Sequence, residues 1–563
     1  MNWRYRFTLG TLVILFCFVI VRLLYWQVVK AAELTTLGKS QYGALITVSP
    51  KRGEILANDG FPLVANKVSY LVFANPKEIE NKDEISKILG NDLQVDPASI
   101  SAQLSLNRFW VPLYYNADFS IKAKIDQEKV NGIGYEEQYS RFYPEASMAA
   151  QLIGFLGKDE LGQDKGYFGL EGYYDRLLKG KAGQSVEIHD AFGRPILAQA
   201  TTQTGVQNGQ TIKLSIDRAI QYDVESKLKD GVEKYGAKQG MAIIMDPKTG
   251  SILAMAVYPK FDPQTFWQYP PQTYINPIIS DFYEPGSTFK SIVMASAIDA
   301  GVVTPDTKCD ICSGPVSLGG FDIRTWDNNY FPNTSMTDVI IHSDNTGMVF
   351  VSKKMGLNRL YSYLNAFGIG HQTDIDLQGE AVPELRSVDQ WRSIDVATAS
   401  FGQGIDVTPI ELLEAFSALA NGGKRMQPHV VSQIQSDDGE VVTIPPREIN
   451  QPISAETAQV ITEILVDAVN KGEAQFARLH GYRIAGKTGT AQIPISGHYD
   501  PSKTVASFIG FAPADNPKFS MLVIYDEPSS SIYGSETAAP TFFTIAKDLL
   551  NYYNIPPSVP NDP

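Results

Sequence analysis

An almost wholly apolar run near the N-terminus, residues 7–29, constrains this chain more than any other feature. A membrane-spanning helix needs about 20 apolar residues, and this run is long enough. Arg4 and Arg6 precede it, and basic residues collect on the cytoplasmic side of such helices. A cleaved signal peptide is the alternative because residues 30–32 include two alanines, but its apolar core has only about 7–15 residues. We therefore predict an uncleaved single-pass anchor with a cytoplasmic N-terminus and an extracytoplasmic remainder.

The remainder has the composition of a folded globular protein. Of its 563 residues, 44% are hydrophobic and 20% are charged, which is enough apolar material for sizeable cores. The net charge of −14, without a basic cluster, would repel a phosphate backbone, so we expect no nucleic-acid binding. The six histidines show no metal-binding spacing, and we predict no catalytic metal and no cofactor.

Cys309 and Cys312 have the Cys-x-x-Cys spacing of many zinc sites. A structural zinc ion needs four ligands, and the sequence offers no second pair. Two interpretations stay open: a short disulfide, if the segment lies outside the cytoplasm, or two ordinary thiols.

Hydrophobic patterning divides the chain near Thr211. Residues 30–210 mix short alternating strands with charged helical stretches. After residue 211, two apolar runs flank a turn sequence and predict a hairpin, and strand-like runs return near the C-terminus. Strands at both ends with helices between them predict an α+β domain whose sheet is closed by the chain's two ends. The expected elements are the hairpin 242–257 with its tip at 246–250, helices 287–300, 408 onward and 542–551, and strands 490–493, 507–512 and 521–525.

Three short patterns that carry chemistry each occur twice, so none identifies a site alone. The three copies that we discard have sufficient structural explanations. Ser226–Lys229 lies on the solvated face of a charged helix, Lys248–Gly250 is the hairpin tip, and Ser105–Asn107 lies in a segment without other signals. The copies that remain are Ser-x-x-Lys at 287–290, Ser-x-Asn at 343–345 and Lys-Thr-Gly at 487–489.

Ser287 follows Pro285 and Gly286 and therefore falls at the start of a predicted helix, where free N–H groups favour negative charge. Lys290 lies one turn later on the same face. Apolar neighbours would desolvate its ammonium group and make it a usable base for the Ser287 hydroxyl. By itself, an N-cap serine beside a surface lysine would be the commoner interpretation.

The order of the three patterns changes that balance. Ser343-Asp344-Asn345 follows Ser287, and Lys487-Thr488-Gly489-Thr490 comes last, which is the signature of serine penicillin-recognising enzymes. We expect Ser343 to relay a proton and Asn345 to hold a substrate amide. Lys487, Thr488 and Thr490 would bind a substrate carboxylate, and Gly489 would let substrate backbone approach the strand. Backbone N–H groups of Ser287 and Thr490 would form the oxyanion hole.

The sequence closely resembles the class B penicillin-binding proteins along essentially its whole extracytoplasmic part. Near the N-terminus it departs from the family pattern at Ala57-Asn58 and at Gln151, which puts partner contacts in doubt rather than the chemistry. The resemblance rests on segments 246–255, 283–290, 404–409, 420–423, 485–492 and 508–513, and on Arg52-Gly53, Arg141-x-Tyr143-Pro144 and Gly166-x-x-Gly169-x-Glu171.

The family implies an elongated, mostly-β pedestal and a transpeptidase domain in which helices flank an antiparallel sheet. We expect a cytoplasmic tail at 1–6, the anchor at 7–29, the pedestal at 30–210, the transpeptidase domain at 211–552 and a proline-rich tail at 553–563.

The family also implies the chemistry. Ser287 would attack the bond between two terminal D-Ala residues of a peptidoglycan stem peptide, and a neighbouring stem's amine would take the acyl group. β-Lactams would acylate the same serine. Tyr283-Glu284-Pro285 resembles division-type more than elongation-type enzymes, so we expect septal wall synthesis, with a SEDS-type glycan polymerase and division-complex proteins as partners.

Three alternatives remain. The enzyme could be of the elongation type, or it could pass the acyl group to water as a membrane-bound β-lactamase or carboxypeptidase. It could also act mainly as a scaffold. The anchor and pedestal argue against a β-lactamase, as does the lack of a clear glutamate motif for deacylation between Asn345 and Lys487. The intact serine and lysine motifs argue against a scaffold.

Overall fold

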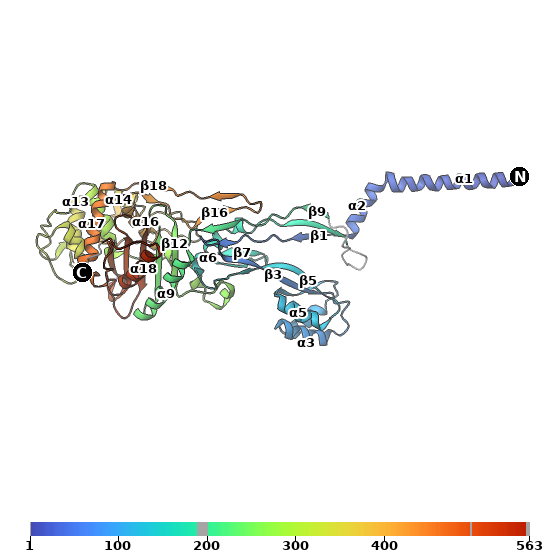
Figure 1. Cartoon of the computed structure of the whole chain (residues 1–563), viewed down its shortest axis with the longest axis horizontal. Coiled ribbons are helices and arrows are strands. Elements are labelled where there is room, and N and C mark those ends of the chain that lie inside the picture. Colours follow the sequence, from blue (N-terminus) through green and yellow to red (C-terminus); the bar gives the residue numbers. More distant parts are fainter. Residues whose placement is uncertain (1, 189–200, 496–497, 559–563) are drawn as a thin grey trace. The chain divides into compact units, whose positions relative to one another are not determined.

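The computed structural model describes residues 2–188, 201–495 and 498–558. The chain forms two compact units, each assembled from several segments (Figure 1). The first comprises Met1–Arg52, Asn66–Ser140 and Gly180–Gly209, and the second comprises Gly53–Ala65, Arg141–Lys179 and Gln210–Pro563. Two segments of the pedestal region thus belong to the second unit. Of the predicted C-terminal tail, residues 559–563 lie outside the described residues.

The first unit begins with the apolar helix. The α-helix α1 (Trp3–Leu24) continues into a π-helical turn, η1 (Tyr25–Val29), and none of the residues in either is buried. The span Trp3–Val29 is long and apolar enough to cross a membrane. Helix α2 (Ala31–Tyr42) follows, and then a three-stranded antiparallel sheet in the order β1 (Gly43–Val48), β8 (Gly183–Ile188) and β9 (Thr201–Thr204).

A small α/β core completes the first unit. Strand β3 pairs with β4 and β5, and the helices pack around buried residues such as Val72, Leu89 and Ile125. Asp96 and Asp118 cap the second and third of these helices through their side chains. The elements are β3 (Pro62–Ala74), α3 (Lys82–Leu93), α4 (Pro97–Leu104), β4 (Val111–Ala117), α5 (Phe119–Glu128) and β5 (Ile133–Phe142).

A five-stranded antiparallel sheet organises the second unit, in the order β12-β11-β21-β20-β19. The first strand of this sheet along the chain, β11, pairs with the last one, β21, so early and late segments of the chain close the sheet as predicted. The strands are β11 (Gln239–Met245), β12 (Ile252–Tyr258), β19 (Ala485–Ile495), β20 (His498–Ala512) and β21 (Phe519–Asp526).

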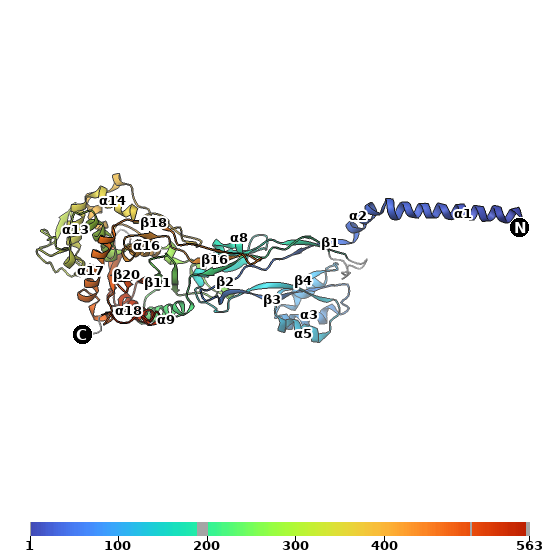
Figure 2. The same ribbon diagram turned by 45° about the horizontal axis from the view of Figure 1, so that its top comes forward.

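Both faces of this sheet are buried, which explains its long apolar runs. Ala242 and Ile244 pack with α9 (Arg218–Tyr235) and α18 (Ala538–Tyr552), two helices that lie side by side in both views (Figures 1 and 2). The alternate residues Met241 and Ile243 face the other core, which holds α10 (Pro277–Ser280), α11 (Lys290–Asp299) and α16 (Pro409–Ala420).

The remaining elements of the second unit are short strands and helices. A second sheet has the order β17-β16-β10-β2-β3. Its strands are β2 (Ile55–Leu56), β10 (Thr211–Leu214), β16 (Val431–Gln435), β17 (Val441–Thr443) and the start of β3. Three strand pairs are β6 (Phe155–Lys158) with β7 (Asp164–Tyr167), β13 (Val316–Leu318) with β14 (Phe321–Ile323), and β15 (Arg425–Met426) with β18 (Glu448–Asn450).

The remaining α-helices of the second unit are α6 (Ala150–Ile153), α7 (Gly169–Tyr173), α8 (Asp175–Leu178), α12 (Met336–Ile341), α13 (Asn345–Met355), α14 (Leu357–Ala366), α15 (Ser393–Ala399) and α17 (Ala455–Lys471). The 3₁₀ turns are η2 (Pro263–Gln268), η3 (Pro271–Tyr274), η4 (Gly286–Phe289), η5 (Val388–Gln390) and η6 (Gln475–Ala477).

Most predicted elements are confirmed, with shifted boundaries. The β11–β12 hairpin has its turn at Asp246–Gly250, and Thr408 caps α16 in a capping box with Pro409 at the first helical position. Strand β19 begins at Ala485 rather than at Thr490, because Lys487, Thr488 and Gly489 pair with Ile509, Phe508 and Ser507 of β20. The C-terminal helix begins at Ala538, four residues before the predicted start.

The structure brings the pedestal motifs of the second unit together. Arg141 Nε donates to Glu171 Oε1 at 2.6 Å, and Arg141 Nη1 donates to the Gly53 carbonyl at 2.8 Å. Both charged side chains are buried. Gln151, one departure from the family pattern, is also buried and donates to the carbonyls of Pro259 and Thr273. The motif residues therefore hold together segments that are far apart in the sequence.

Candidate active site

A cleft of about 740 Å³ in the second unit brings together residues from all three retained patterns. Ser287, Ser343, Asn345, Thr488 and Thr490 line it. Lys290 and Lys487 lie buried, with 0% and 3% of their surface exposed. The other lining residues are Gly286, Arg324, Thr325, Trp326, Asn328, Phe401, Gln403, Glu473, Phe476, Gln492, Thr504, Ile532, Tyr533, Ser535 and Glu536.

Ser287 lies in the 3₁₀ turn η4 rather than at the start of an ordinary α-helix, and α11 continues directly from that turn. The turn is fixed on both sides. Thr288 Oγ1 donates to the Pro285 carbonyl at 2.7 Å, and the Gly286 N–H donates to the Gly402 carbonyl at 3.0 Å. Ser287 is half-buried at the cleft wall, so a fixed backbone presents its hydroxyl to the cavity.

Lys290 makes three hydrogen bonds with the Ser-x-Asn segment. Its Nζ donates to the Ser343 carbonyl at 2.5 Å, to Asn345 Oδ1 at 2.8 Å and to Ser343 Oγ at 3.2 Å. Burial is the main cause that lowers the pKa of Lys290 to about 7, and repulsion from Lys487 lowers it further. A large fraction of this lysine is therefore neutral near pH 7, as the sequence argument requires of a base.

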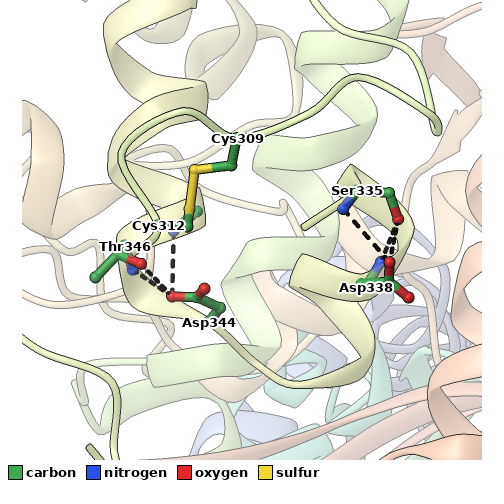
Figure 3. Close-up of a disulfide and its surroundings, with 7 residues drawn as sticks. Cys309, Cys312, Ser335, Asp338, Asp344 and Thr346 are labelled. Atoms are coloured by element: carbon green, nitrogen blue, oxygen red, sulfur yellow. Dashed lines mark hydrogen bonds between the residues drawn. A yellow bond between two sulfur atoms is a disulfide. The ribbon is translucent and has the colours of Figure 1, made fainter. Parts of the chain in front are cut away.

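Two capped helices hold the Ser-x-Asn segment. Ser335 and Asp338 form a capping box at the start of α12, and the Asp344 side chain accepts from the N–H groups of Thr346 and Gly347 at the start of α13 (Figure 3). Between these helices Ser343 takes a left-handed φ of 56°. This geometry turns the Ser343 and Asn345 side chains toward Lys290.

Cys309 and Cys312 form a disulfide near these caps, which resolves the two interpretations left open by the sequence (Figure 3). Both cysteines are fully buried. The Cys309 N–H donates to the Thr334 carbonyl at 2.9 Å, and the backbones of Lys308 and Ser335 form an isolated antiparallel β-bridge. The disulfide segment is thus tied to the N-terminus of α12.

Lys487 and Thr488 interact with each other and with a residue that the sequence argument missed. Lys487 Nζ donates to Thr488 Oγ1 at 2.9 Å, and Thr488 Oγ1 donates to Glu473 Oε2 at 2.8 Å. Burial lowers the pKa of Lys487, while Glu473 raises it. The Thr488 hydroxyl proton is therefore directed at Glu473 and not into the cleft.

Gly489 is closely packed inside the protein, whereas Thr490 keeps a hydrogen-bond donor that no protein group accepts from in the described structure. A Cβ on Gly489 would lie 2.3 Å from Ser507 Oγ and 2.8 Å from Thr288 Cγ2, so close packing inside the protein requires the glycine. Thr490 Oγ1 accepts from the Gly534 N–H at 3.1 Å. Its own hydroxyl proton can therefore be donated to a ligand.

Several lining residues could not be predicted from the sequence, because no local pattern marks them. The backbone carbonyl of Arg324 accepts a hydrogen bond from the Asn345 side-chain amide at 2.9 Å. The rings of Trp326 and Tyr533 pack edge to face, with their centroids 5.7 Å apart. Glu473 lies in the interval where no deacylation motif was recognised. All of them come from loops whose placement depends on tertiary structure.

The discarded copies of the patterns do not line the cleft. Ser226 is exposed on α9, which packs on the same face of the sheet as α18. Lys248–Gly250 forms the tip of the β11–β12 hairpin. Within residues 2–188, 201–495 and 498–558, no group of three or more His, Cys, Asp or Glu side chains could hold a metal ion.

A sheet covered on both faces by helices, with a serine and two buried lysines at one cleft, is the architecture of the serine penicillin-recognising enzymes. Comparison with protein families agrees. The penicillin-binding protein transpeptidase domain matches residues 240–551, and the penicillin-binding protein dimerisation domain matches residues 47–214.

Among curated proteins, stage V sporulation protein D of Bacillus subtilis is 33% identical over 98% of this chain and 86% of its own length. Peptidoglycan D,D-transpeptidase FtsI of Escherichia coli is 29% identical over 99% of this chain and 93% of its own. The protein therefore belongs to the class B penicillin-binding proteins, the serine-type peptidoglycan D,D-transpeptidases.

Solved structures show the same fold. A peptidoglycan synthetase from Bifidobacterium adolescentis superposes with a TM-score of 0.74 at 25% identity, covering 92% of this chain and 98% of its own. Penicillin-binding protein 3 from Mycobacterium tuberculosis, complexed with aztreonam, superposes with a TM-score of 0.71 at 26% identity, covering 92% of this chain and 99% of its own.

Proposed function

We propose that the protein cross-links peptidoglycan stem peptides through an acyl-enzyme on Ser287, with release of D-Ala, during septal wall synthesis. The observation that carries the proposal is the single cleft that collects Ser287, Ser343, Asn345, Thr488 and Thr490 beside two buried lysines. Chemistry at this cleft needs a nucleophile, a base and a site for the terminal carboxylate of the donor peptide.

Neutral Lys290 is the base in the first step. It takes the proton of the Ser287 hydroxyl while Ser287 Oγ attacks the carbonyl carbon between the two D-Ala residues. Backbone N–H groups of Ser287 and Thr490 stabilise the oxyanion. The proton then passes from Lys290 through Ser343 Oγ, at 3.2 Å, to the departing amine, and the C–N bond breaks.

In the second step, the amine of a neighbouring stem loses a proton through the same path and attacks the ester carbonyl. The Ser287–acyl bond breaks, and the serine recovers its proton. Lys487 and the Thr490 hydroxyl bind the donor's carboxylate, and Asn345 holds a substrate amide. A β-lactam acylates Ser287 in the same way, and the aztreonam complex named for a structural relative supports that expectation.

The full-length enzyme in detergent, supplied with glycan strands that carry pentapeptide stems, tests this activity. We expect equal amounts of released D-Ala and new cross-links, and neither with Ser287→Ala. Release of D-Ala without cross-links would identify a carboxypeptidase, and rapid turnover of nitrocefin would identify a β-lactamase. Either result would contradict the proposal.

The septal role rests on Tyr283-Glu284-Pro285, which resembles the division type and is held near the nucleophile. The Tyr283 backbone pairs with Val407, and Glu284 accepts from the Gly404 N–H at 2.8 Å. We propose that Trp3–Val29 anchors the chain with its N-terminus in the cytoplasm, and that a SEDS-type polymerase and division-complex proteins are partners. A fluorescently tagged chain should form rings at division sites, and lateral-wall patches would contradict the septal role.

A further inference from the structure

Glu473 is the acidic residue of the cleft that connects directly to the lysine motifs. It lines the cavity, and its Oε2 accepts the Thr488 hydroxyl, which in turn accepts from Lys487 Nζ. The other glutamate of the cleft, Glu536, is instead bonded to Ser531 Oγ at 2.6 Å. The two carboxylates therefore share a cavity but have different partners.

The backbone fixes Glu473 where α17 ends. Gly472 ends that helix, and a Cβ there would lie 2.3 Å from the Ala468 carbonyl oxygen and 2.9 Å from that of Ile341. The Gln475 N–H donates to the Gly472 carbonyl at 3.2 Å and starts the turn η6. This close approach sets Glu473 against the end of α12, two residues before Ser343.

The charges in this region need a resident partner. Lys290 and Lys487 are both buried and repel each other when both are charged, and a buried ammonium group without a counter-ion is costly. The charges that act most strongly on Lys290 are Lys487 from β19, Glu473 from the end of α17 and Asp344 at the start of α13. Asp344 already accepts the Thr346 and Gly347 N–H groups. Glu473 is the carboxylate that acts on both lysines.

We propose that Glu473 is a positioning residue of this site, whose carboxylate holds the Thr488 hydroxyl and serves as the resident counter-ion that sets the charge states of Lys487 and Lys290. The inference rests on the proposed function, because it assigns neutral Lys290 as the base and charged Lys487 as the carboxylate anchor. It leaves the Thr490 hydroxyl, rather than that of Thr488, free to donate to the substrate's carboxylate, and Lys487 supplies positive charge from its buried position.

The sign of the effect follows from the charges. A nearby anion stabilises an ammonium group, so Glu473 raises the pKa of both lysines. Acylation needs a neutral Lys290, so the pKa of Lys290 sets the acidic limb of the pH profile of the acylation rate. It also needs a charged Lys487, so the pKa of Lys487 sets the alkaline limb. Removing the anion lowers both pKa values, so the whole bell-shaped profile moves toward lower pH.

The test is the second-order rate of Ser287 acylation by a fluorescent penicillin between pH 5 and 10, with the full-length enzyme in detergent. Glu473→Gln keeps an acceptor for the Thr488 hydroxyl but removes the charge, and we expect both limbs to shift down by about half a pH unit or more. Glu473→Asp, which keeps the charge, should restore the wild-type limbs. Glu536→Gln removes an equal charge from the same cleft and should leave both limbs in place.

A merely structural role of Glu473 would lower the rate of Glu473→Gln equally at every pH and leave both limbs unmoved, which would overturn the inference. Limbs that move upward, or that move equally in Glu536→Gln, would overturn it as well. Thermal unfolding of each variant separates loss of folded protein from loss of rate. If wild-type enzyme forms no adduct on Ser287 at any pH, the proposed function fails and the inference fails with it.

Discussion

At the scale of single residues, the site depends on the burial of Lys290 away from water. Burial lowers the pKa of its ammonium group, and repulsion from Lys487 adds to that effect. In that position Nζ lies within hydrogen-bond distance of Ser343 and Asn345, so the group that we propose as the base is both partly neutral and oriented. Apolar flanks in the sequence predict this desolvation, but only the fold supplies the partners.

Acylation by penicillin should therefore rise with pH through a midpoint at about 7, because the neutral fraction of Lys290 increases as the pH passes its pKa of about 7. Lys290→Arg cannot become neutral in this range and should lose roughly 10²- to 10⁴-fold in rate. Rapid-mixing measurements with a fluorescent penicillin check both statements. A variant that keeps more than a tenth of the wild-type rate near pH 7 would contradict the role of Lys290 as base.

The two threonines of the third motif should differ in importance. The Thr488 hydroxyl donates to Glu473, whereas the Thr490 hydroxyl only accepts, from Gly534, and keeps its proton for a carboxylate. A hydrogen bond to a charged group contributes about 1.5–3 kcal/mol, so Thr490→Val should lower acylation roughly 10- to 100-fold. Thr488→Val should cost clearly less in the same assay, and the reverse order would contradict this assignment of donors.

At the scale of elements, caps and short turns set the geometry that the motifs need. The helix start at Thr408 is predicted from the sequence and is confirmed, whereas the capping box at Ser335 is not among the predictions. The 3₁₀ turn at Gly286–Phe289 and the left-handed Ser343 are not readable, because long-range contacts impose them. Strand β19 begins earlier than its apolar pattern suggests, because pairing with β20 extends through Lys487-Thr488-Gly489.

The Cys309–Cys312 disulfide should contribute modestly to stability. It closes a very short loop, for which chain entropy gives about 2 kcal/mol. The double variant Cys309→Ala with Cys312→Ala should unfold at lower temperature in calorimetry yet keep Ser287 acylation within about threefold, because neither cysteine lines the cleft. Abolished acylation in a folded double variant would show that the disulfide shapes the site through α12.

At the scale of the whole molecule, the sequence motifs identify the family, the α+β class and the order of the catalytic segments. Glu473 shows where that reasoning stops. It belongs to no motif, and it reaches the site only because Gly472 lets α17 end against Ile341. The Arg141–Glu171 pair shows the opposite case: two motifs visible in the sequence meet in the second unit, although nothing local predicts their contact.

Removing one partner of that pair should strongly destabilise the second unit. Removing one partner of a buried ion pair typically costs about 3–5 kcal/mol, because the other charge stays buried. Arg141→Ala should therefore lower the urea midpoint strongly, and Arg218→Ala, which breaks the more exposed pairs with Asp59 and Glu145, should lower it much less. Equal losses would contradict the importance assigned to burial.

The central claim is that Ser287 carries the acyl group. Intact-mass analysis of the full-length enzyme after incubation with penicillin, followed by peptide mapping, tests it most directly. We predict one adduct per chain, on the peptide that contains Ser287 and Lys290, and none on Ser287→Ala. An adduct on the discarded Ser226 copy, or one that persists in Ser287→Ala, would contradict the account.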